Sequence, residues 1–356
     1  MAYTDIDNPE LYFQCKLYTG SSGAQSITLD GSENMQPDWI WIKERGATGG
    51  HVVTDTVRGI SASSAPFLQP SATGVEINAN GTVANRTLTS SNTDGFTLGQ
   101  DAYYTNFNNN SDTYVAWNWK ASGSTATNTE GNVNTTISAN TTAGFSIISA
   151  DPGSTSGELT LGHGLGTVPT FFIWKNRETD GQNWQVFHQA TGTGLTILNS
   201  TAAKNTDVTF WNTHTTTLFK MTTHMYAQNK DFIGYCFSDR QGFSKFGSYT
   251  GNGSLDGPFI GLTFKPAWLM IKRTDTTNSW VMFDNKRNAF NVVDKHLFAN
   301  TTDPEDSSAN YNEVDFLSNG FKLREDNNTI NASGGTYIFM AFAESPFTNS
   351  SGVPNN

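Results

Sequence analysis

The sequence predicts an all-β protein made of three tandem repeat domains, each a β-sandwich or jelly-roll-like unit of about 100 residues. Three observations lead to this prediction. A set of short apolar segments occurs three times in the same order. Thr and aromatic residues suited to strands stand beside abundant turn-forming Asn and Gly, and no long segment has the 3.6-residue period of a helix. The length of 356 residues also exceeds the ~150 residues of one ordinary domain.

A strand entered through proline is the clearest shared element. It occupies residues 37–43, 169–175 and 266–272, with the same spacing from proline to lysine each time. Proline is tolerated at the first residue of a strand, and the continuous apolar run after it predicts a central strand buried on both faces. Trp174 lies one residue later than Trp41 relative to its proline. We therefore expect the large indole to change faces between the first two copies.

Further segments complete each copy. A second strand, after a variable polar connection, is predicted at residues 51–55, 184–188 and 280–284. A third is predicted at 94–98, 217–221 and 319–323, and a fourth at 114–119, 232–237 and 337–342. An opening strand and turn lie near 17–20, 145–153 and 248–251. Because the hairpin tips differ among the copies, binding activity is expected there and in the long loops.

These segments divide the chain into unit 1 (residues 1–121, including an N-terminal segment), unit 2 (143–241) and unit 3 (242–347), followed by a polar tail (348–356). Residues 122–142 are rich in Ser, Thr, Asn and Ala, which predicts a linker or a long surface strand. Near the start, Asn8-Pro9-Glu10 predicts one capped turn of helix.

The composition excludes several classes of partner. The formal net charge is −11, with 21 Lys and Arg against 32 Asp and Glu, which disfavours nucleic acid. With no secretory leader and no apolar run of ~20 residues, we expect a soluble protein made in a cytoplasm, without membrane insertion. The two cysteines, Cys15 and Cys236, occupy different positions of different copies. They are expected to be buried apolar side chains, not a disulfide.

Residues that often carry chemistry do not form a known pattern. The six histidines lack metal-ligand spacing, and His163 lies in a glycine-rich stretch without the end of a phosphate loop. The acidic stretches 303–306 and 325–328 are expected to be solvated loops, with a calcium site as the alternative. We predict no enzyme, with no catalytic, cofactor-binding or metal-binding residues and no cofactor. Trp211, the one tryptophan outside the shared strands, is expected to pack, with ligand contact as the alternative.

Four stretches carry a resemblance to a known family: Tyr12–Gly20, Gln36–Lys43, Gly242–Gly253 and Asn331–Glu344. With them, nearly the whole chain resembles the uncharacterised structural proteins of tailed bacteriophages, particularly phages of marine bacteria. Those proteins contain a domain of unknown function associated with virions. The resemblance therefore implies location in the virion and transfers no catalytic or binding residue.

Three functions are then in question. The expected one is a non-enzymatic virion structural protein, a tail fibre, appendage or receptor-binding component that adheres to proteins or to a host surface glycan or receptor. The alternatives are a capsid decoration or head-fibre protein, in which three similar units imitate a trimer, and an appendage polysaccharide depolymerase. Other virion proteins are expected partners, and the chain is expected to be oligomeric or attached to the particle.

The N-terminal residues 1–11 are the candidate docking segment. They precede the first repeat, have no counterpart in the other copies, and carry Tyr3, Ile6 and Leu11 among acidic residues. A disordered leader is the alternative. Because the chain has no heptad pattern for a coiled coil, contacts with a particle are expected from sheet faces, strand edges or the polar termini.

Overall fold

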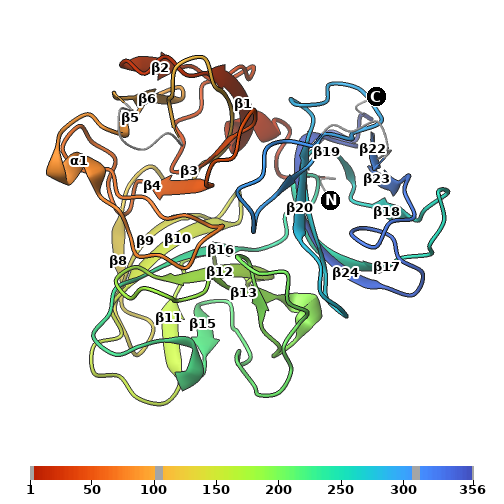
Figure 1. The fold of residues 1–356 in the computed structure, drawn as a ribbon. Coiled ribbons are helices and arrows are strands. Elements are labelled where there is room, and N and C mark those ends of the chain that lie inside the picture. The colour runs from red at the N-terminus through yellow and green to blue at the C-terminus, as the bar shows by residue number, and fades with distance from the viewer. Residues whose placement is uncertain (1–3, 101–106, 307–312, 355–356) are drawn as a thin grey trace.

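The computed structural model describes residues 4–100, 107–306 and 313–354. The prediction of an all-β fold is confirmed, because these residues form antiparallel sheets with only short helical segments between them. Those segments are η1 Pro9–Leu11, α1 Ala79–Thr82, η2 Gln189–Thr191 and η3 Thr223–Met225. The predicted capped turn is η1, where Asn8 accepts a hydrogen bond from the backbone N–H of Glu10. Figure 1 shows three groups of strands around a common centre.

Unit 1 folds into two sheets. The larger has the strand order β1-β7-β3-β4 and the smaller the order β2-β6-β5. Their bounds are β1 Phe13–Thr19, β2 Gln25–Ile27, β3 Trp39–Glu44, β4 Val52–Asp55, β5 Leu88–Ser91, β6 Phe96–Leu98 and β7 Thr113–Trp119.

Unit 2 contributes to a seven-stranded sheet of order β14-β13-β12-β16-β10-β9-β8 and contains the pair β11-β15. The strands before its central hairpin are β8 Ala126–Asn128, β9 Thr135–Asn140, β10 Phe145–Ala150 and β11 Leu159–Gly162. The others are β12 Phe171–Asn176, β13 Gln185–His188, β14 Thr196–Ile197, β15 Leu218–Met221 and β16 Phe232–Phe237.

Unit 3 has a five-stranded sheet of order β17-β24-β19-β20-β21 and a smaller sheet of order β18-β23-β22. Its first strands are β17 Ser244–Thr250, β18 Phe259–Gly261, β19 Phe264–Arg273 and β20 Trp280–Asp284. The remaining strands are β21 Leu297–Phe298, β22 Val314–Leu317, β23 Gly320–Leu323 and β24 Thr336–Pro346.

The three large sheets share one arrangement of four strands. The matching orders are β1-β7-β3-β4, β10-β16-β12-β13 and β17-β24-β19-β20. The registers also match two residues after each shared proline, where Trp39 pairs with Asp55, Phe171 with His188 and Trp268 with Asp284. The prolines thus hold corresponding places, which favours the hypothesis of three copies of one unit.

Residues 122–142 belong to the sheet of unit 2. Strand β9 pairs along β10, and β8 pairs with β9. The segment thus forms two strands of the sheet, β8 and β9, where its composition predicts a linker or one long surface strand. The apolar side chains of Val133 and Ile137 are buried in the core of unit 2, and β9 hydrogen-bonds the edge of β10. Few apolar residues are therefore enough to order this segment.

The central strands are buried on both faces, as their apolar runs predict. In β3, Trp39 and Trp41 enter the core shared by all three sheets, whereas Ile40 packs in the separate core of unit 1. In β12, Trp174 points away from the shared core and into the core of unit 2. The predicted change of face of the large indole is therefore confirmed.

Aromatic side chains from all three large sheets meet in the shared core. All nine tryptophans of the chain are at most 1% exposed. Ring contacts join every pair of units: Trp39 with Tyr235 (4.3 Å between centroids), Trp119 with Trp268 (5.7 Å) and Phe237 with Phe342 (5.8 Å). Such pairs contribute about 0.5–1.5 kcal/mol each beyond the area they bury.

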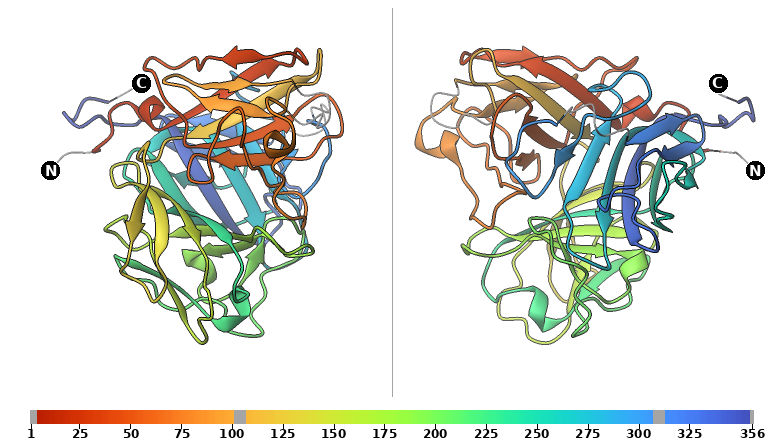
Figure 2. Two further views of the ribbon diagram at one scale, coloured as in Figure 1. Left: turned by 90° about the vertical axis from the view of Figure 1, so that its left-hand side faces the viewer. Right: turned by 45° about the vertical axis from the view of Figure 1, so that its right-hand side comes forward.

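The two ends of the described chain lie on the same side of the body, as both views in Figure 2 show. The backbone N–H of Ser350 donates to the carboxylate of Asp7 at 2.6 Å. The polar tail is therefore bound to the N-terminal segment at this point.

The shared lysine at the end of each central strand crosses to the neighbouring unit. Each ammonium group donates to one backbone carbonyl there: Lys43 to Thr302 (3.4 Å), Lys175 to Thr73 (2.9 Å) and Lys272 to Thr201 (3.3 Å). Burial lowers the pKa of all three lysines to about 8. The three contacts form a closed cycle, which we call the ring: unit 1 donates to unit 3, unit 2 to unit 1, and unit 3 to unit 2. We name the three regions of contact seam 3–1, seam 1–2 and seam 2–3 after the units that they join.

A second set of hydrogen bonds follows the same cycle. In each unit a side-chain ring nitrogen at the start of the second shared strand forms a hydrogen bond with a backbone carbonyl of the neighbouring unit. The pairs are His51 with Phe298 (2.9 Å), Trp184 with Gln69 (2.9 Å) and Trp280 with Ile197 (2.8 Å). Each of these carbonyls lies four residues before the carbonyl that accepts from the shared lysine. Because donors and acceptors both hold corresponding places, the three seams are built alike. The ring is closed by polar contacts as well as by the aromatic core.

Two of the seams also contain an ionic network. In seam 1–2, Arg177 forms two hydrogen bonds of 2.8 Å with Glu76, which Arg58 contacts at 3.0 Å. Although burial would raise it, the hydrogen bond from Arg177 and the charge of Arg58 hold the pKa of Glu76 below its usual value. Seam 3–1 repeats the pattern with Arg45, Glu305 and Arg287, at distances of 2.9, 2.9 and 3.4 Å.

We expect Glu76→Gln to destabilise the protein by about 3 kcal/mol, because it leaves the buried guanidinium of Arg58 and that of Arg177 without their shared carboxylate. The matched control is Glu178→Gln, whose 4.0 Å pair with Lys230 is largely exposed. It should cost less than about 0.5 kcal/mol. Urea unfolding measures both values, and equal effects would contradict a structural role for the seam network.

Candidate functional site

The candidate docking segment is folded against the body. Tyr3 lies outside the described residues. Ile6 is 3% exposed and belongs to the shared core, and Leu11 is half-buried at the end of η1. Thr4 donates through its hydroxyl to the carbonyl of Gln241 at 2.8 Å. The docking assignment is therefore wrong for Ile6, whose side chain packs inside the protein, and the disordered leader is not observed for the described part of this segment.

The other residues considered for chemistry have structural surroundings. Glu305, from the acidic stretch 303–306, is part of the ionic network of seam 3–1. Across residues 4–100, 107–306 and 313–354, no three His, Cys, Asp or Glu side chains gather closely enough to hold a metal ion. Cys15 and Cys236 are separate buried thiols, and burial raises the pKa of both. None of the helices in the described part is long and apolar enough to cross a membrane.

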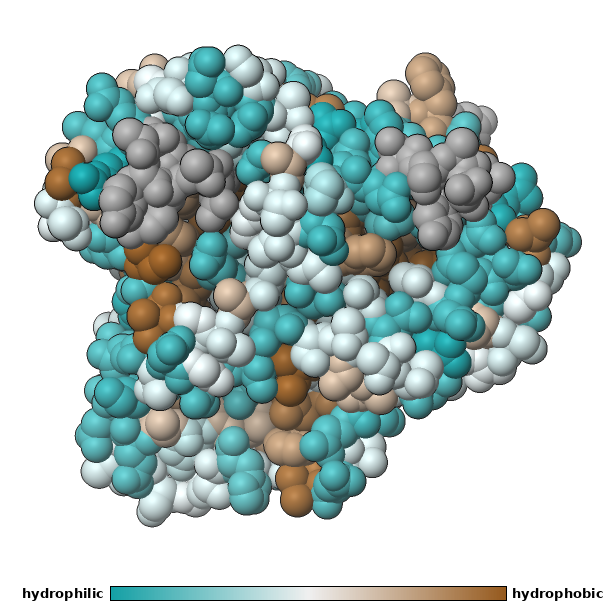
Figure 3. Space-filling model, in the orientation of Figure 1, coloured by the Kyte–Doolittle hydropathy of each residue, from teal (hydrophilic) through white to brown (hydrophobic). Residues whose placement is uncertain are grey.

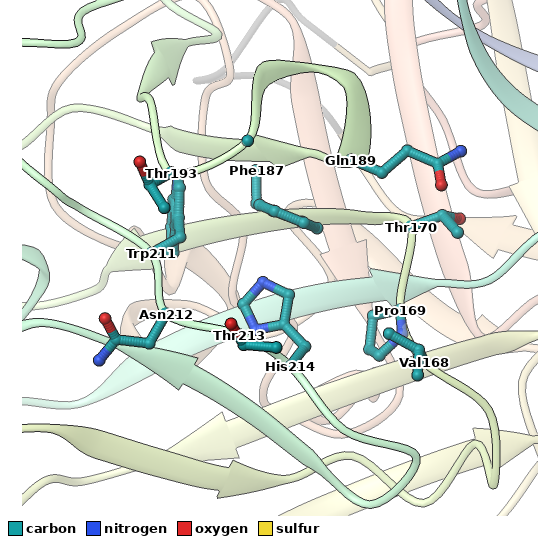
Figure 4. Close-up of a pocket in the computed structure, with 11 residues that line it drawn as sticks. Val168, Pro169, Thr170, Phe187, Gln189, Thr193, Trp211, Asn212, Thr213 and His214 are labelled. Atoms are coloured by element: carbon teal, nitrogen blue, oxygen red, sulfur yellow. The ribbon is translucent and has the colours of Figure 1, made fainter.

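A pocket of about 360 Å³ opens on unit 2 and is our candidate functional site. Its floor and walls come from the segment just before β12, the end of β13 with the η2 turn, and the segment before β15. Figure 4 shows His214 pointing toward Phe187, with Trp211 on one side and Val168 and Pro169 on the other. The surface in Figure 3 is mainly hydrophilic, with apolar patches on the lower lobe that unit 2 forms. We call this cavity the unit 2 pocket.

Two buried hydrogen-bond donors of this pocket have no partner among the described residues. They are the indole Nε1 of Trp211, a residue 0% exposed, and the imidazole Nε2 of His214, a residue 8% exposed. Leaving a buried polar group unpaired costs about 1–3 kcal/mol. Unpaired groups beside a cavity therefore point to a ligand that supplies hydrogen-bond acceptors.

The protonation state of His214 follows from its neighbours. Its Nδ1 accepts a hydrogen bond from the backbone N–H of Lys220 at 3.1 Å, so the neutral ring carries its proton on Nε2. Burial, together with the nearby charges of His163 and Lys220, lowers the pKa of His214 to about 3. The ring is therefore a neutral donor throughout the physiological range.

The aromatic rings of the pocket are held firmly. His214 stacks on Phe219 with 3.9 Å between centroids and meets Phe187 at 4.3 Å in a perpendicular arrangement. Phe187 also packs edge-on against Trp211 at 6.0 Å. Since each ring is fixed by another, the pocket is formed before any ligand binds.

The lining has no formal charge. Its polar side chains are amides and hydroxyls, from Thr170, Gln189, Thr193, Asn212 and Thr213, beside the neutral imidazole. An ionic ligand would find no counter-charge there, whereas a neutral ligand with hydroxyl groups and an apolar face would match both parts of the lining.

This combination of rings is specific to unit 2. Bridge partners show that Leu88 of unit 1 and Val314 of unit 3 hold the place of Trp211. The place of Phe187 is taken by Thr54 in unit 1. The pocket thus lies where the units differ, beside strands that they share.

The sequence alone indicates only part of this site. Trp211 is distinguished in the sequence because it lies outside the shared strands, and in the structure it is both packed and beside the cavity. The sequence does not indicate His214 or Phe187, since their contact brings together β13 and the segment before β15, which belongs to another sheet. The one signal in the sequence was the unusual bulk of Trp211 at a place where the other units have Leu88 and Val314.

The fold and the site define an all-β protein with three similarly ordered sheets and one preformed neutral pocket. A family model matches residues 8–346, and the chain belongs to this family, described as Domain of unknown function (DUF7483). The single match spans all three units, so the family corresponds to the whole ring and not to one sheet pair. No curated protein and no solved structure matches the chain.

We expect Trp211→Phe to destabilise the protein less than Trp174→Phe, by about 1–3 kcal/mol. Both changes remove an indole N–H from a fully buried ring, but only that of Trp174 has a partner, the carbonyl of Met225 at 3.1 Å. Chemical denaturation of the two variants provides the comparison. A larger loss for Trp211→Phe would mean that its N–H is already satisfied in the ligand-free protein.

Proposed function

We propose that this protein is a non-enzymatic structural component of a bacteriophage particle, acting as a tail fibre, appendage or receptor-binding protein. The resemblance of four stretches, from Tyr12–Gly20 to Asn331–Glu344, to virion proteins supports the location. A rigid body closed by three seams and one aromatic core suits a part that must keep its shape while attached to a larger assembly.

The unit 2 pocket is the observation that carries the adhesive role. Two unpaired donors, Trp211 Nε1 and His214 Nε2, lie beside apolar surface from Val168 and Pro169. A neutral sugar has hydroxyl oxygens to accept these bonds and a C–H face that packs on rings and apolar side chains. We therefore propose a neutral host-surface glycan as the ligand class.

The same lining supports binding over cleavage. Glycoside hydrolysis ordinarily needs two carboxyl groups on either side of the scissile bond. The residues lining the unit 2 pocket include no Asp and no Glu. The proposal of a depolymerase is therefore weaker than that of an adhesin at this site.

A capsid decoration or head-fibre protein is the second candidate, and the ring of seams favours it. Lys43, Lys175 and Lys272 make corresponding contacts around a closed cycle of three units. One chain of this kind presents approximate threefold symmetry, which matches a local threefold position on a capsid. Such a protein would bind the capsid through the outer surfaces of its three units, and the unit 2 pocket would lie on one of these three sides.

The glycan proposal is tested with a panel of neutral oligosaccharides and the purified full chain. We expect Trp211→Phe to weaken binding of any hit about tenfold, because one hydrogen bond is lost while a ring remains. Tyr226→Phe, which removes a hydroxyl bonded to the carbonyl of Gly157 elsewhere on unit 2, should leave affinity unchanged. Binding that both variants retain would place the ligand outside this pocket.

The affinity for a neutral sugar should be constant between pH 5 and 8. With a pKa of about 3, His214 stays neutral over this whole range and gains a proton only in stronger acid. Calorimetric titrations at pH 5, 6.5 and 8 test this expectation. A change in affinity centred near pH 6.5, the ordinary value for histidine, would contradict the assigned state of His214.

Location separates the two particle functions. Gold-labelled antibodies against the purified protein, applied to intact phage particles, should mark the tail or its appendages. Label spread over the capsid would support decoration instead, and absence of the chain from purified particles would refute both.

A further inference from the structure

Seam 2–3 has the same backbone framework as the other two seams. In each seam one backbone N–H donates to a carbonyl two residues beyond the shared lysine: Glu76 to Arg177 (2.8 Å), Lys204 to Thr274 (2.9 Å) and Glu305 to Arg45 (2.8 Å). These bonds identify the corresponding residues without reference to side chains. Lys204 thus occupies the place of Glu76 and Glu305. Thr274 occupies the place of Arg177 and Arg45.

The charge at this place is therefore inverted. In seam 1–2 the carboxylate of Glu76 pairs with Arg58, and in seam 3–1 that of Glu305 pairs with Arg287. Arg58 and Arg287 each lie three residues after the last residue of the second shared strand. In seam 2–3 the residue three positions after His188 is Thr191, whose hydroxyl donates to the carbonyl of His188. Seam 2–3 has lost the acid and both guanidinium groups and has gained one ammonium group.

A cavity of about 380 Å³ lies where the ionic network is missing. Lys204 lines it from unit 2, and Ser248, Thr250, Thr274 and Thr336 line it with hydroxyl groups from unit 3. Its volume is within the ~300–1,000 Å³ of pockets that bind small molecules. The lost side chains have therefore been replaced by an open polar space.

The remaining charges near the cavity are compensated, apart from Lys204. Asp275, next to Thr274, forms two hydrogen bonds with Arg273 at 3.0 and 2.9 Å. The arginine hydrogen bond lowers the pKa of Asp275 to about 2. No acidic side chain of the described residues pairs with Lys204.

We propose that this cavity binds a small hydroxylated carboxylate of the sugar-acid class. The carboxylate takes the place that the guanidinium groups of Arg177 and Arg45 hold in the other seams, and it pairs with the ammonium group of Lys204. The hydroxyls of Ser248, Thr250 and Thr336 bond those of the ligand. The proposal is independent of the unit 2 pocket, whose lining is uncharged.

Titration of the full chain with glucuronate, glucose and sulfate tests the proposal. Glucuronate should bind, glucose should bind at least tenfold more weakly, and Lys204→Gln should reduce glucuronate affinity at least tenfold. Lys230→Gln, an exposed lysine of the same unit, is the matched control and should change nothing. Trp211→Phe, in the unit 2 pocket, should also leave glucuronate binding intact, which separates this site from the glycan site.

A second variant tests the same inference by rebuilding the missing network. Lys204→Glu combined with Thr274→Arg should restore the pair found in the other seams, raise the melting temperature and abolish glucuronate binding. No glucuronate binding to the natural chain, or binding unaffected by Lys204→Gln, would overturn the proposal. Sulfate binding as tight as glucuronate would reduce the site to a general anion site and overturn the sugar-acid assignment.

Discussion

The structure depends on one constraint: each large sheet has two apolar faces, and both must be covered. One face of each sheet packs within its own unit, as Ile40 and Trp174 do. The other face carries Trp39, Trp119, Trp268 and their neighbours, and no small sheet covers it. Three such faces cover one another, which accounts for a single shared core. The seams then fix how the sheets are turned, because a buried lysine requires an acceptor at a defined place.

The same constraint explains where variation is possible. Side chains in the shared core cannot change without leaving a buried group unpaired or a cavity. The small sheets and the connections around them have more freedom, and the unit 2 pocket lies there. Seam 2–3 shows a second kind of variation, in which the backbone framework is kept while Glu and Arg are replaced by Lys204 and Thr274. Both candidate sites therefore lie where the side chains of one unit or seam differ from those at the corresponding places of the others.

The sequence predicts the strands better than the contacts between the three units. Pro37, Pro169 and Pro266 located the central strands, and the one-residue offset of Trp174 predicted its change of face, because strand periodicity is local. The shared lysines were visible in the same pattern, but their acceptors lie 71 to 259 residues away. The error at Ile6 has the same origin, since an apolar residue before the first repeat looks exposed until the shared core forms around it. His214 could not be assigned because neither its tautomer nor its partner Phe187 is a local property.

The shared core also has a consequence for how the chain is made. While the ribosome is still synthesising unit 3, the finished sheets of units 1 and 2 lack the surface that covers Trp119 and Phe237. Nascent chains that stall or are cut at this stage would present exposed aromatic faces, the kind of surface that chaperones bind and that promotes aggregation. Productive assembly therefore depends on the arrival of the last third of the polypeptide, and cells producing this protein in quantity would be sensitive to incomplete translation.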